Sequence, residues 1–184
     1  MQRRTTNTVH VGDIAIGSGH PIGVQSMPCA APSDVAANVA QALALKEAGC
    51  DIVRLAIPTM DDIRLISSIK NEVDIPLVAD IQFDYRLAIA AVKAGIDKVR
   101  INPGNIGGSD RVHAVVEACR DRHIPIRIGV NSGSLEKDIL QKYGRPSAEA
   151  LGRPYFCRIS FSSDPLLTPI LMGICRSRQA STTA

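Results

Sequence analysis

The spacing of hydrophobic residues changes period several times between residues 8 and 150. Short apolar, β-branched runs, typical of strands buried on both faces, alternate with segments whose apolar residues recur every three or four positions, as on one face of a helix. The strand-like runs are residues 22–27, 52–57, 77–81, 98–102 and 126–131. Five such runs, separated by single helical segments, predict an α/β protein built from parallel βαβ units with right-handed crossovers.

Residues suited to starting a helix precede the helical segments. In the first segment, Val35, Val39, Ala42 and Leu43 are expected to face the core, and the helix is expected to end at Gly49. The expected N-caps are Ser33 or Asp34, Thr59, Ser109 and Ser134, with further helix starts at Asp84 and Ser147. Ahead of the first parallel strand, Thr-Val-His-Val and Ile-Ala-Ile flank a Gly-Asp pair (residues 8–16), which predicts a β-hairpin.

Three arginines interrupt these apolar runs at corresponding positions. They are Arg54, Arg100 and Arg127, and Asp80 occupies the equivalent place in a fourth run. The intervals of 26, 20 and 27 residues are each about one βα module. Polar residues at the ends of successive strands converge on one mouth in a barrel, whereas an open doubly wound sheet has its ligand site at one switch point. The pattern therefore favours a TIM barrel, of which about five βα units are present.

A buried, unpaired guanidinium costs several kcal/mol, so the three arginines need anionic partners. They are either ligands for an anion such as phosphate, which the planar guanidinium binds bidentately, or partners of buried carboxylates. Only Asp80 is an in-phase carboxylate, which favours an anion site. Asp80 itself could orient an arginine, accept a hydrogen bond from a substrate hydroxyl, or neutralise charge. Asn102 and Asn131, at the strand ends, are turn formers or ligands of the same site.

Composition excludes several classes of function. The net charge of +3 equals that of residues 152–184, which hold four arginines and one aspartate, so the rest of the 184-residue chain is balanced. A balanced body without a basic stripe argues against nucleic-acid binding. No apolar run approaches the ~18 residues of a membrane span, and the first residues resemble no secretory signal. We therefore expect a cytoplasmic protein that binds neither nucleic acid nor membrane.

The five cysteines are expected to be free thiols, because their number is odd and no two are spaced as Cys-x-x-Cys. Cys119 and His123 have the spacing of helical metal ligands, but no third ligand lies nearby in the sequence. Asp61 and Asp62 are most simply explained as solvated residues or as complements of a helix dipole, and the four histidines as surface or packing residues. No residue stands out as a nucleophile, general base or metal ligand, so we expect no catalytic and no metal-binding residue in this chain.

The chain contains several long, distinctive strings. They are Pro-Ile-Gly-Val-Gln-Ser-Met (21–27), Asp-Ile-Val-Arg (51–54), Pro-Leu-Val-Ala-Asp-Ile-Gln-Phe-Asp-Tyr-Arg (76–86), Val-Arg-Ile-Asn-Pro-Gly-Asn-Ile-Gly (99–107) and Pro-Ile-Arg-Ile-Gly-Val-Asn-Ser-Gly-Ser-Leu-Glu-Lys-Asp (125–138). These strings resemble those of one enzyme family, bacterial 4-hydroxy-3-methylbut-2-enyl diphosphate synthase. The resemblance runs from about residue 2 to residue 151.

The resemblance implies a TIM-barrel substrate domain followed by an iron–sulfur domain. The family reductively opens the ring of 2-C-methyl-D-erythritol 2,4-cyclodiphosphate in non-mevalonate isoprenoid biosynthesis. It is a homodimer and receives electrons from flavodoxin or ferredoxin through a [4Fe–4S] cluster. The positions matching Arg54, Arg100 and Arg127 hold the diphosphate in that family, and Asp80, Asn102 and Asn131 match residues that line its pocket.

The chain departs from the family pattern in two places. Gln82 stands where the family usually has histidine, which puts any charged or acid–base role there in doubt. Residues 1–151 match the first part of the barrel domain, whereas residues 152–184 match nothing in the family and show no regular periodicity. The expectation is a frameshifted or truncated reductase that lacks the cluster domain and its ligands. Five strands would leave two unpaired edges, so we expect the chain alone to be inactive and to fold poorly or recruit a partner.

Two other readings of the sequence remain open. One is a non-catalytic truncated product or a binding subunit completed by a separate chain. The other is a different phosphate-binding barrel enzyme, similar to dihydropteroate synthase.

Overall fold

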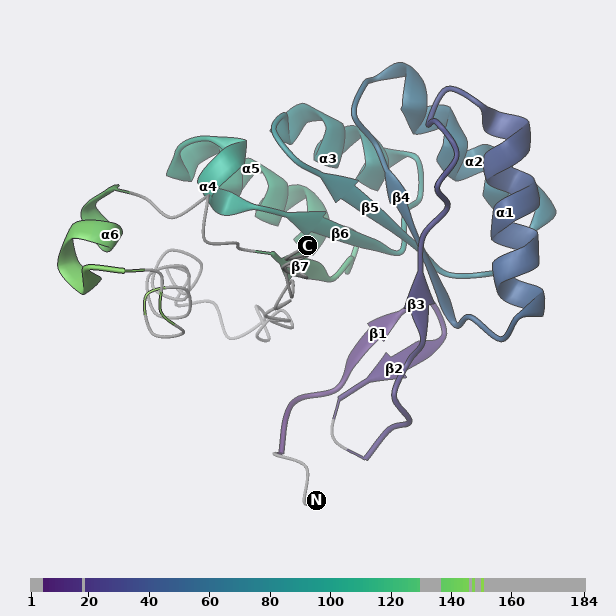
Figure 1. Cartoon of the computed structure of the whole chain (residues 1–184), viewed down its shortest axis with the longest axis horizontal. Helices are drawn as coiled ribbons and strands as arrows, with labels where there is room; N and C mark the ends of the chain where they lie inside the picture. Colours follow the sequence, from purple (N-terminus) through teal and green to yellow (C-terminus); the bar gives the residue numbers. More distant parts are fainter. Residues whose placement is uncertain (1–4, 18, 130–136, 146, 148–149, 151–184) are drawn as a thin grey trace, which may run out of the picture.

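The computed structural model describes residues 5–17, 19–129, 137–145, 147 and 150. Its largest unit is a five-stranded parallel sheet, and helices cover one face of it (Figure 1). In chain order the elements are β1 (Val9–Val11), β2 (Ile14–Ile16), β3 (Gln25–Ser26), α1 (Val35–Glu47), β4 (Ile52–Ala56), the 3-10 turn η1 (Asp61–Ile63), α2 (Arg64–Glu72), β5 (Leu77–Ile81), α3 (Tyr85–Lys93), β6 (Lys98–Ile101), α4 (Pro103–Ile106), α5 (Ser109–Arg120), β7 (Ile126–Ile128) and α6 (Lys137–Tyr143).

The order of the strands in the sheet is the order of the strands in the chain, β3-β4-β5-β6-β7. A doubly wound sheet reverses its order at a switch point, whereas successive strands of a barrel lie side by side in sequence order. Each pair of neighbours is parallel and joined by one or more helical segments. The arrangement is therefore that of consecutive units of a TIM barrel, and the predicted α/β fold class is confirmed.

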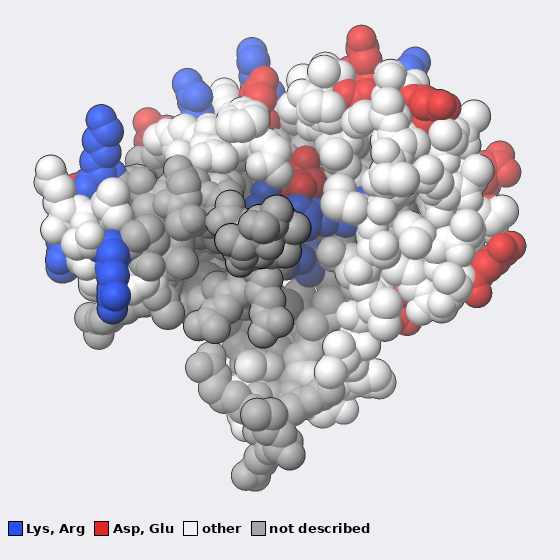
Figure 2. Space-filling model, in the orientation of Figure 1, with Lys and Arg blue, Asp and Glu red and all other residues white. Residues whose placement is uncertain are grey.

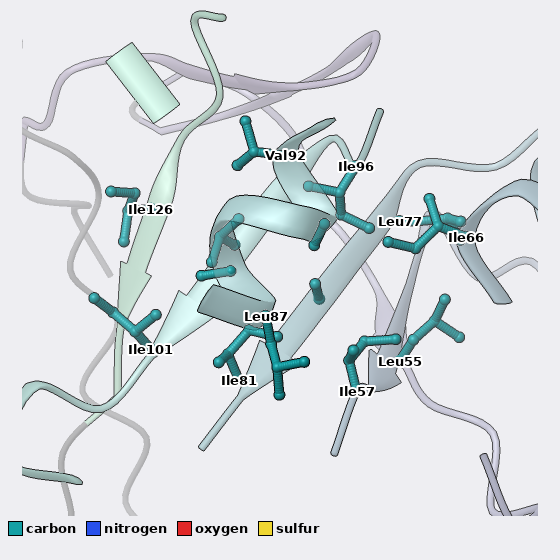
Figure 3. Close-up of a cluster of buried hydrophobic side chains, with 14 of the residues drawn as sticks. Leu55, Ile57, Ile66, Leu77, Ile81, Leu87, Val92, Ile96, Ile101 and Ile126 are labelled. Carbon is teal, nitrogen blue, oxygen red and sulfur yellow. The ribbon is translucent and has the colours of Figure 1, made fainter. Parts of the chain in front are cut away.

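The core lies between the sheet and its helices. Side chains on the helix-covered face of the strands are buried and pack against apolar residues of α2 and α3 (Figure 3). Apolar residues of α5 belong to the same cluster. Leu55, Leu77, Ile81 and Ile101 are each at most 1% exposed. Burial of this kind contributes ~25 cal/mol for each Å² of apolar surface removed from water, which makes this face the main source of stability.

The predicted hairpin is present, with β1 and β2 paired antiparallel through Val9–Ile16 and Val11–Ile14. Gly12, in the turn, has φ +59° and lies close to Pro76, just before β5. Val11 packs with Ile52 and Val78 on the sheet face that the helices do not cover. The hairpin therefore closes that face near the amino ends of the strands.

Two predicted helix caps are wrong in detail. Thr59 does not cap the second helix, because its backbone N–H and hydroxyl both donate to the Asp62 carboxylate, and η1 intervenes before α2. Asp62 is therefore a hydrogen-bond acceptor for Thr59. It is 5% exposed and not the solvated residue expected. Gly108, one residue ahead of Ser109, is the N-cap of α5.

Other features of the helices agree with the sequence. Asp34 caps α1 by accepting from the Ala37 N–H, and Asp84 accepts from the Arg86 N–H at the start of α3. Leu43 is an exception, being 45% exposed. It lies one residue beyond the buried Ala42, outside the stripe that faces the core. Ser134 lies outside the described residues, whereas the Ser147 hydroxyl accepts from the Ala150 N–H, as a helix start would.

The first parallel strand is much shorter than its apolar run predicts. Only Gln25 and Ser26 pair with β4, and Ile22 and Val24 are 77% and 55% exposed. β3 has a described neighbour on one side only, so most of the run 22–27 forms no ladder. The proposed tail, residues 152–184, lies outside the described residues. None of the described helices combines the length and the hydropathy needed to cross a bilayer.

Candidate functional site

The sheet face opposite the helices, called here the inner face, carries the charged side chains. Side chains alternate between the two faces of a strand, so the apolar residues at odd-numbered positions of β5 face the helices and Val78 and Asp80 face inward. The same alternation places Arg54 of β4, Lys98 and Arg100 of β6 and Arg127 of β7 on the inner face. The sequence order of the strands therefore brings these side chains together.

The strand register places the inner-face charges in two layers. Asp80 pairs with Arg100, which pairs with Arg127, and these three form the layer toward the carboxyl ends. Arg54 pairs with Val78, which pairs with Lys98, one layer deeper. The sequence-based expectation that the three arginines occupy equivalent positions is thus wrong for Arg54. Its long side chain nevertheless reaches up to Asp80 of the upper layer.

Asp80 is the centre of the upper layer. Its Oδ2 accepts from Arg54, through Nε at 3.2 Å and through Nη2, and its Oδ1 accepts from Arg100 Nη1 at 3.0 Å. Gln82 Nε2 donates to the same Oδ1 at 2.9 Å. A carboxylate offers about four lone-pair sites, so these donors saturate it. Of the roles left open for Asp80, orienting arginines and neutralising charge fit this geometry, and accepting from a substrate hydroxyl does not.

Gln82 contributes a hydrogen bond but no charge. Because its amide nitrogen donates to Asp80, the oxygen of the same amide remains on the other side of the group. A neutral histidine could make an equivalent donation, but only histidine could also bring a positive charge there. Gln82 therefore helps to orient Asp80 without adding a titratable group to the inner face.

Two inner-face cations have no carboxylate partner among the described residues. The guanidinium of Arg127 makes no hydrogen bond or ion pair with them, although Arg100 is its register neighbour. Lys98 is 3% exposed and likewise makes none. Burial, and secondarily the charge of Arg127, lowers the pKa of Lys98 from 10.5 to about 8. The inner face of β4–β7 thus carries four cations and one carboxylate.

Lys98 was missed as a site residue in the sequence, where only the arginines were singled out. The signal was available, since Lys98 precedes Arg100 by two residues in a strand and must share its face. A lysine at a strand start is commonly solvated, however, and only the assembled sheet buries it.

Asn102 continues the same face at the end of β6. Its Oδ1 accepts from the Gly104 N–H at 3.1 Å, which caps the short helix α4. Its Nδ2 is buried and has no hydrogen-bond partner among the described residues. An unsatisfied buried amide N–H costs about 1–3 kcal/mol, so this group is suited to donate to a bound ligand. Asn102 thus has the turn role expected of it, and its role as a ligand stays a prediction, whereas Asn131 lies outside the described residues.

The charges are accessible on one side of the molecule. Figure 2 shows Lys or Arg side chains beside Asp or Glu side chains toward the middle of the face in view. Arg54 and Arg100 retain 21% and 13% side-chain exposure. A cluster with excess positive charge, partly exposed donors and one buried free N–H can bind a polyanion such as a diphosphate. No general base or nucleophile accompanies these groups among the described residues.

The described residues do not fit an iron–sulfur cluster or another multi-ligand metal centre. No group of three histidine, cysteine, aspartate or glutamate side chains is placed to hold a metal within the described ranges. Cys29, Cys50 and Cys119 are free thiols; Cys119 lies in α5, and the other two lie in the segments before and after α1. Burial raises the pKa of Cys119 to about 12, so it stays protonated, unlike a thiolate ligand.

Some known proteins are similar to this chain in sequence, and others are similar in fold. The GcpE TIM-barrel domain matches residues 6–181, so this match extends beyond residue 151, where the resemblance was expected to end. The 4-hydroxy-3-methylbut-2-en-1-yl diphosphate synthase (flavodoxin) of Pseudoalteromonas translucida is 56% identical over 151 residues, which are 82% of this chain and 41% of that protein. The enzyme of the same name from Enterobacter sp. strain 638 is 54% identical over 151 residues, with the same coverage. The chain thus spans about 41% of the length of these relatives.

Solved structures with a similar backbone include dihydropteroate synthases. The Xanthomonas albilineans enzyme with 4-aminobenzoic acid has a TM-score of 0.53 and 17% identity, covering 75% of this chain and 57% of its own. The Yersinia pestis enzyme has a TM-score of 0.54 and 12% identity, covering 74% and 54%. At this identity the likeness shows the barrel fold alone. The strand order of the sheet and the family match over residues 6–181 agree, and the chain belongs to the GcpE TIM-barrel family.

Proposed function

We propose that this chain carries the diphosphate-binding part of a 4-hydroxy-3-methylbut-2-en-1-yl diphosphate synthase. The observation that carries the proposal is the excess of cations on the inner face. Arg54 and Arg100 share the single carboxylate of Asp80, while Arg127 and Lys98 have no anionic partner among the described residues. An anionic ligand would supply the missing countercharge.

The residues divide the work of binding between orientation and charge. Asp80 holds the guanidinium groups of Arg54 and Arg100 in fixed positions, so less side-chain entropy is lost when a ligand binds. Arg127 supplies a guanidinium free to bind two phosphate oxygens, and the Asn102 Nδ2 supplies a neutral donor. Asn131, at the end of the same strand run as Arg127, is proposed as a further ligand.

The substrate we propose is 2-C-methyl-D-erythritol 2,4-cyclodiphosphate, whose ring the family opens reductively. In the family a [4Fe–4S] cluster supplies the electrons of this step, received from flavodoxin or ferredoxin. Since the described residues offer no ligand set for a cluster, this part of the chain is assigned binding and not electron transfer. We also propose the homodimeric assembly and cytoplasmic location of the family for this protein.

The test is binding of anions to the 184-residue chain, measured by isothermal titration calorimetry. Pyrophosphate and the cyclic diphosphate are expected to bind, with affinity falling as salt rises because the contact is electrostatic. Arg127→Gln should weaken binding roughly tenfold or more, by loss of one charge-assisted contact. Arg120→Gln, on the outer surface of α5, is the matched control and should bind as the unsubstituted chain does.

The outcomes of these measurements distinguish between the possible roles of the site. Binding that is equally affected by Arg127→Gln and Arg120→Gln, or no binding of either anion, would contradict the proposal. Binding of the cyclic diphosphate without its reduction, in the presence of reduced flavodoxin, would assign the chain a binding role alone. Reduction of the substrate would show that the chain also carries the redox function.

A further inference from the structure

Gly129 lies where the guanidinium of Arg100 crosses the end of β7. The glycine is buried, and its N–H donates to the Ile101 carbonyl at 2.9 Å, so its backbone is held against β6. Its own carbonyl lies 3.5 Å from Arg100 Nη2, within hydrogen-bond distance. The guanidinium therefore spans the gap from Asp80 on β5 to the backbone of Gly129 beyond β7.

This position has no room for a side chain while Arg100 keeps its place. A Cβ at residue 129 would lie 2.7 Å from Cζ of Arg100 and closer still to its Nε and Nη2. Real carbon contacts are about 3.5–4.0 Å, so even a methyl group would overlap the guanidinium. Nothing else obliges residue 129 to be glycine, since its φ lies outside the left-handed region.

We propose that Gly129 is a positioning residue that sets the location of the Arg100 guanidinium in the anion site. The proposal rests on the proposed function, because it concerns how tightly that site holds a diphosphate. A side chain at 129 would push the flexible end of Arg100 away, since the backbone of Gly129 is tied to Ile101 and cannot yield as easily. The displaced guanidinium would lose its alignment with Asp80 Oδ1 and with the bound anion.

The test is a double-mutant cycle on the full 184-residue chain, combining Gly129→Ala with Arg100→Ala. Pyrophosphate affinity is measured by calorimetry, and the midpoint of urea unfolding is measured without ligand. Gly129→Ala alone is expected to weaken binding roughly tenfold, because the displaced guanidinium loses a charge-assisted contact with the anion. It should also lower the unfolding midpoint. In the Arg100→Ala background it should change neither quantity, because the group it displaces is absent.

Two further variants guard the interpretation. Gly23→Ala is the control glycine, since its Cβ would meet Ile14 and Ile52 at an ordinary 3.9 Å, and it should bind pyrophosphate normally. Arg100→Ser, whose side chain is also too short to reach residue 129, gives a second background in which Gly129→Ala should have no effect.

Equal losses from Gly129→Ala in all backgrounds would overturn the proposal, because they would assign Gly129 to the strand backbone. No loss in any background would overturn it too. If the unsubstituted chain does not bind pyrophosphate, the proposed function fails, and the unfolding midpoints still decide whether Gly129 positions Arg100. The two failures are thereby distinguishable.

Discussion

Asp80 and Ile81 are consecutive residues of β5, and both are buried, yet they belong to regions held together by different forces. Ile81 is fully buried on the helix-covered face, where apolar contacts stabilise the fold without directional partners. Asp80 is buried on the inner face among cations, two of which it binds. The helix-covered face, called here the outer face, is packed with apolar side chains in the described residues. The inner face retains cations without a carboxylate partner and an amide nitrogen without a hydrogen-bond partner there. The difference indicates that stability resides on one face and binding on the other.

The largest effect on the free energy of unfolding is expected from a cavity on the outer face. Ile81→Ala should lower the free energy of unfolding by about 4 kcal/mol, because a fully buried isoleucine is replaced with a cavity. Urea unfolding followed by circular dichroism measures the loss. The folded fraction should still bind pyrophosphate with unchanged affinity. A large drop in affinity without a drop in stability would show that the two faces are not separable in this way.

Asp80→Asn, one residue earlier, should lower the free energy of unfolding by about 3 kcal/mol, because Arg54 and Arg100 would lose their shared countercharge. Unlike the loss from Ile81→Ala, this one should shrink when pyrophosphate is present, since an anion can replace the carboxylate. Pyrophosphate at about 100 times its Kd adds roughly 2.7 kcal/mol by mass action. The loss can shrink only if Asp80→Asn binds pyrophosphate more tightly than the unsubstituted chain does, so equal or weaker binding by Asp80→Asn would contradict this prediction.

Lys98→Met tests the inner face in the opposite direction. Burial lowers the pKa of Lys98 to about 8, so below that pH the folded protein holds a charge it disfavours. From about pH 8 to 10.5 the unfolded chain binds more protons than the folded one, and the free energy of unfolding should rise with pH. At pH 7 the substitution should stabilise the chain by up to about 3 kcal/mol, at 1.36 kcal/mol per pKa unit.

Urea unfolding of both chains between pH 7 and 10.5 checks whether Lys98→Met raises the free energy of unfolding. The gain from Lys98→Met should diminish toward the top of that range, because the folded and unfolded states of the unsubstituted chain both approach neutrality at Lys98. Destabilisation at pH 7 would show that Lys98 has a favourable partner.

Arg127→Gln should have the smallest effect on stability. Arg127 makes no ion pair among the described residues and neighbours Arg100 in the register, so its loss removes repulsion and little attraction. We expect a change in the free energy of unfolding within about 1 kcal/mol, the range of ordinary surface charges. Thermal unfolding without ligand measures it, and Arg120→Gln provides the reference for a surface arginine on a helix.

The sequence was most informative where one physical signal dominated. Buried runs such as 77–81 could only be strands, and Asp34 and Asp84 were recognisable helix starts. It was less informative where two groups competed for one role. At Thr59 the carboxylate of Asp62 takes the capping hydrogen bonds, and the apolar run 22–27 is mostly unpaired because only Gln25 and Ser26 meet β4.

The sequence by itself determined the order of the strands, the alternation that places Arg54, Asp80, Arg100 and Arg127 on one face, and the likeness to the family. These follow from local periodicity and from strings of residues. The tertiary structure decided the register that sets Arg54 a layer deeper, the burial of Lys98, and the saturation of Asp80 by its donors. Apart from the contact between Gln82 and Asp80, such features depend on contacts between residues 20 or more positions apart, which no local pattern encodes.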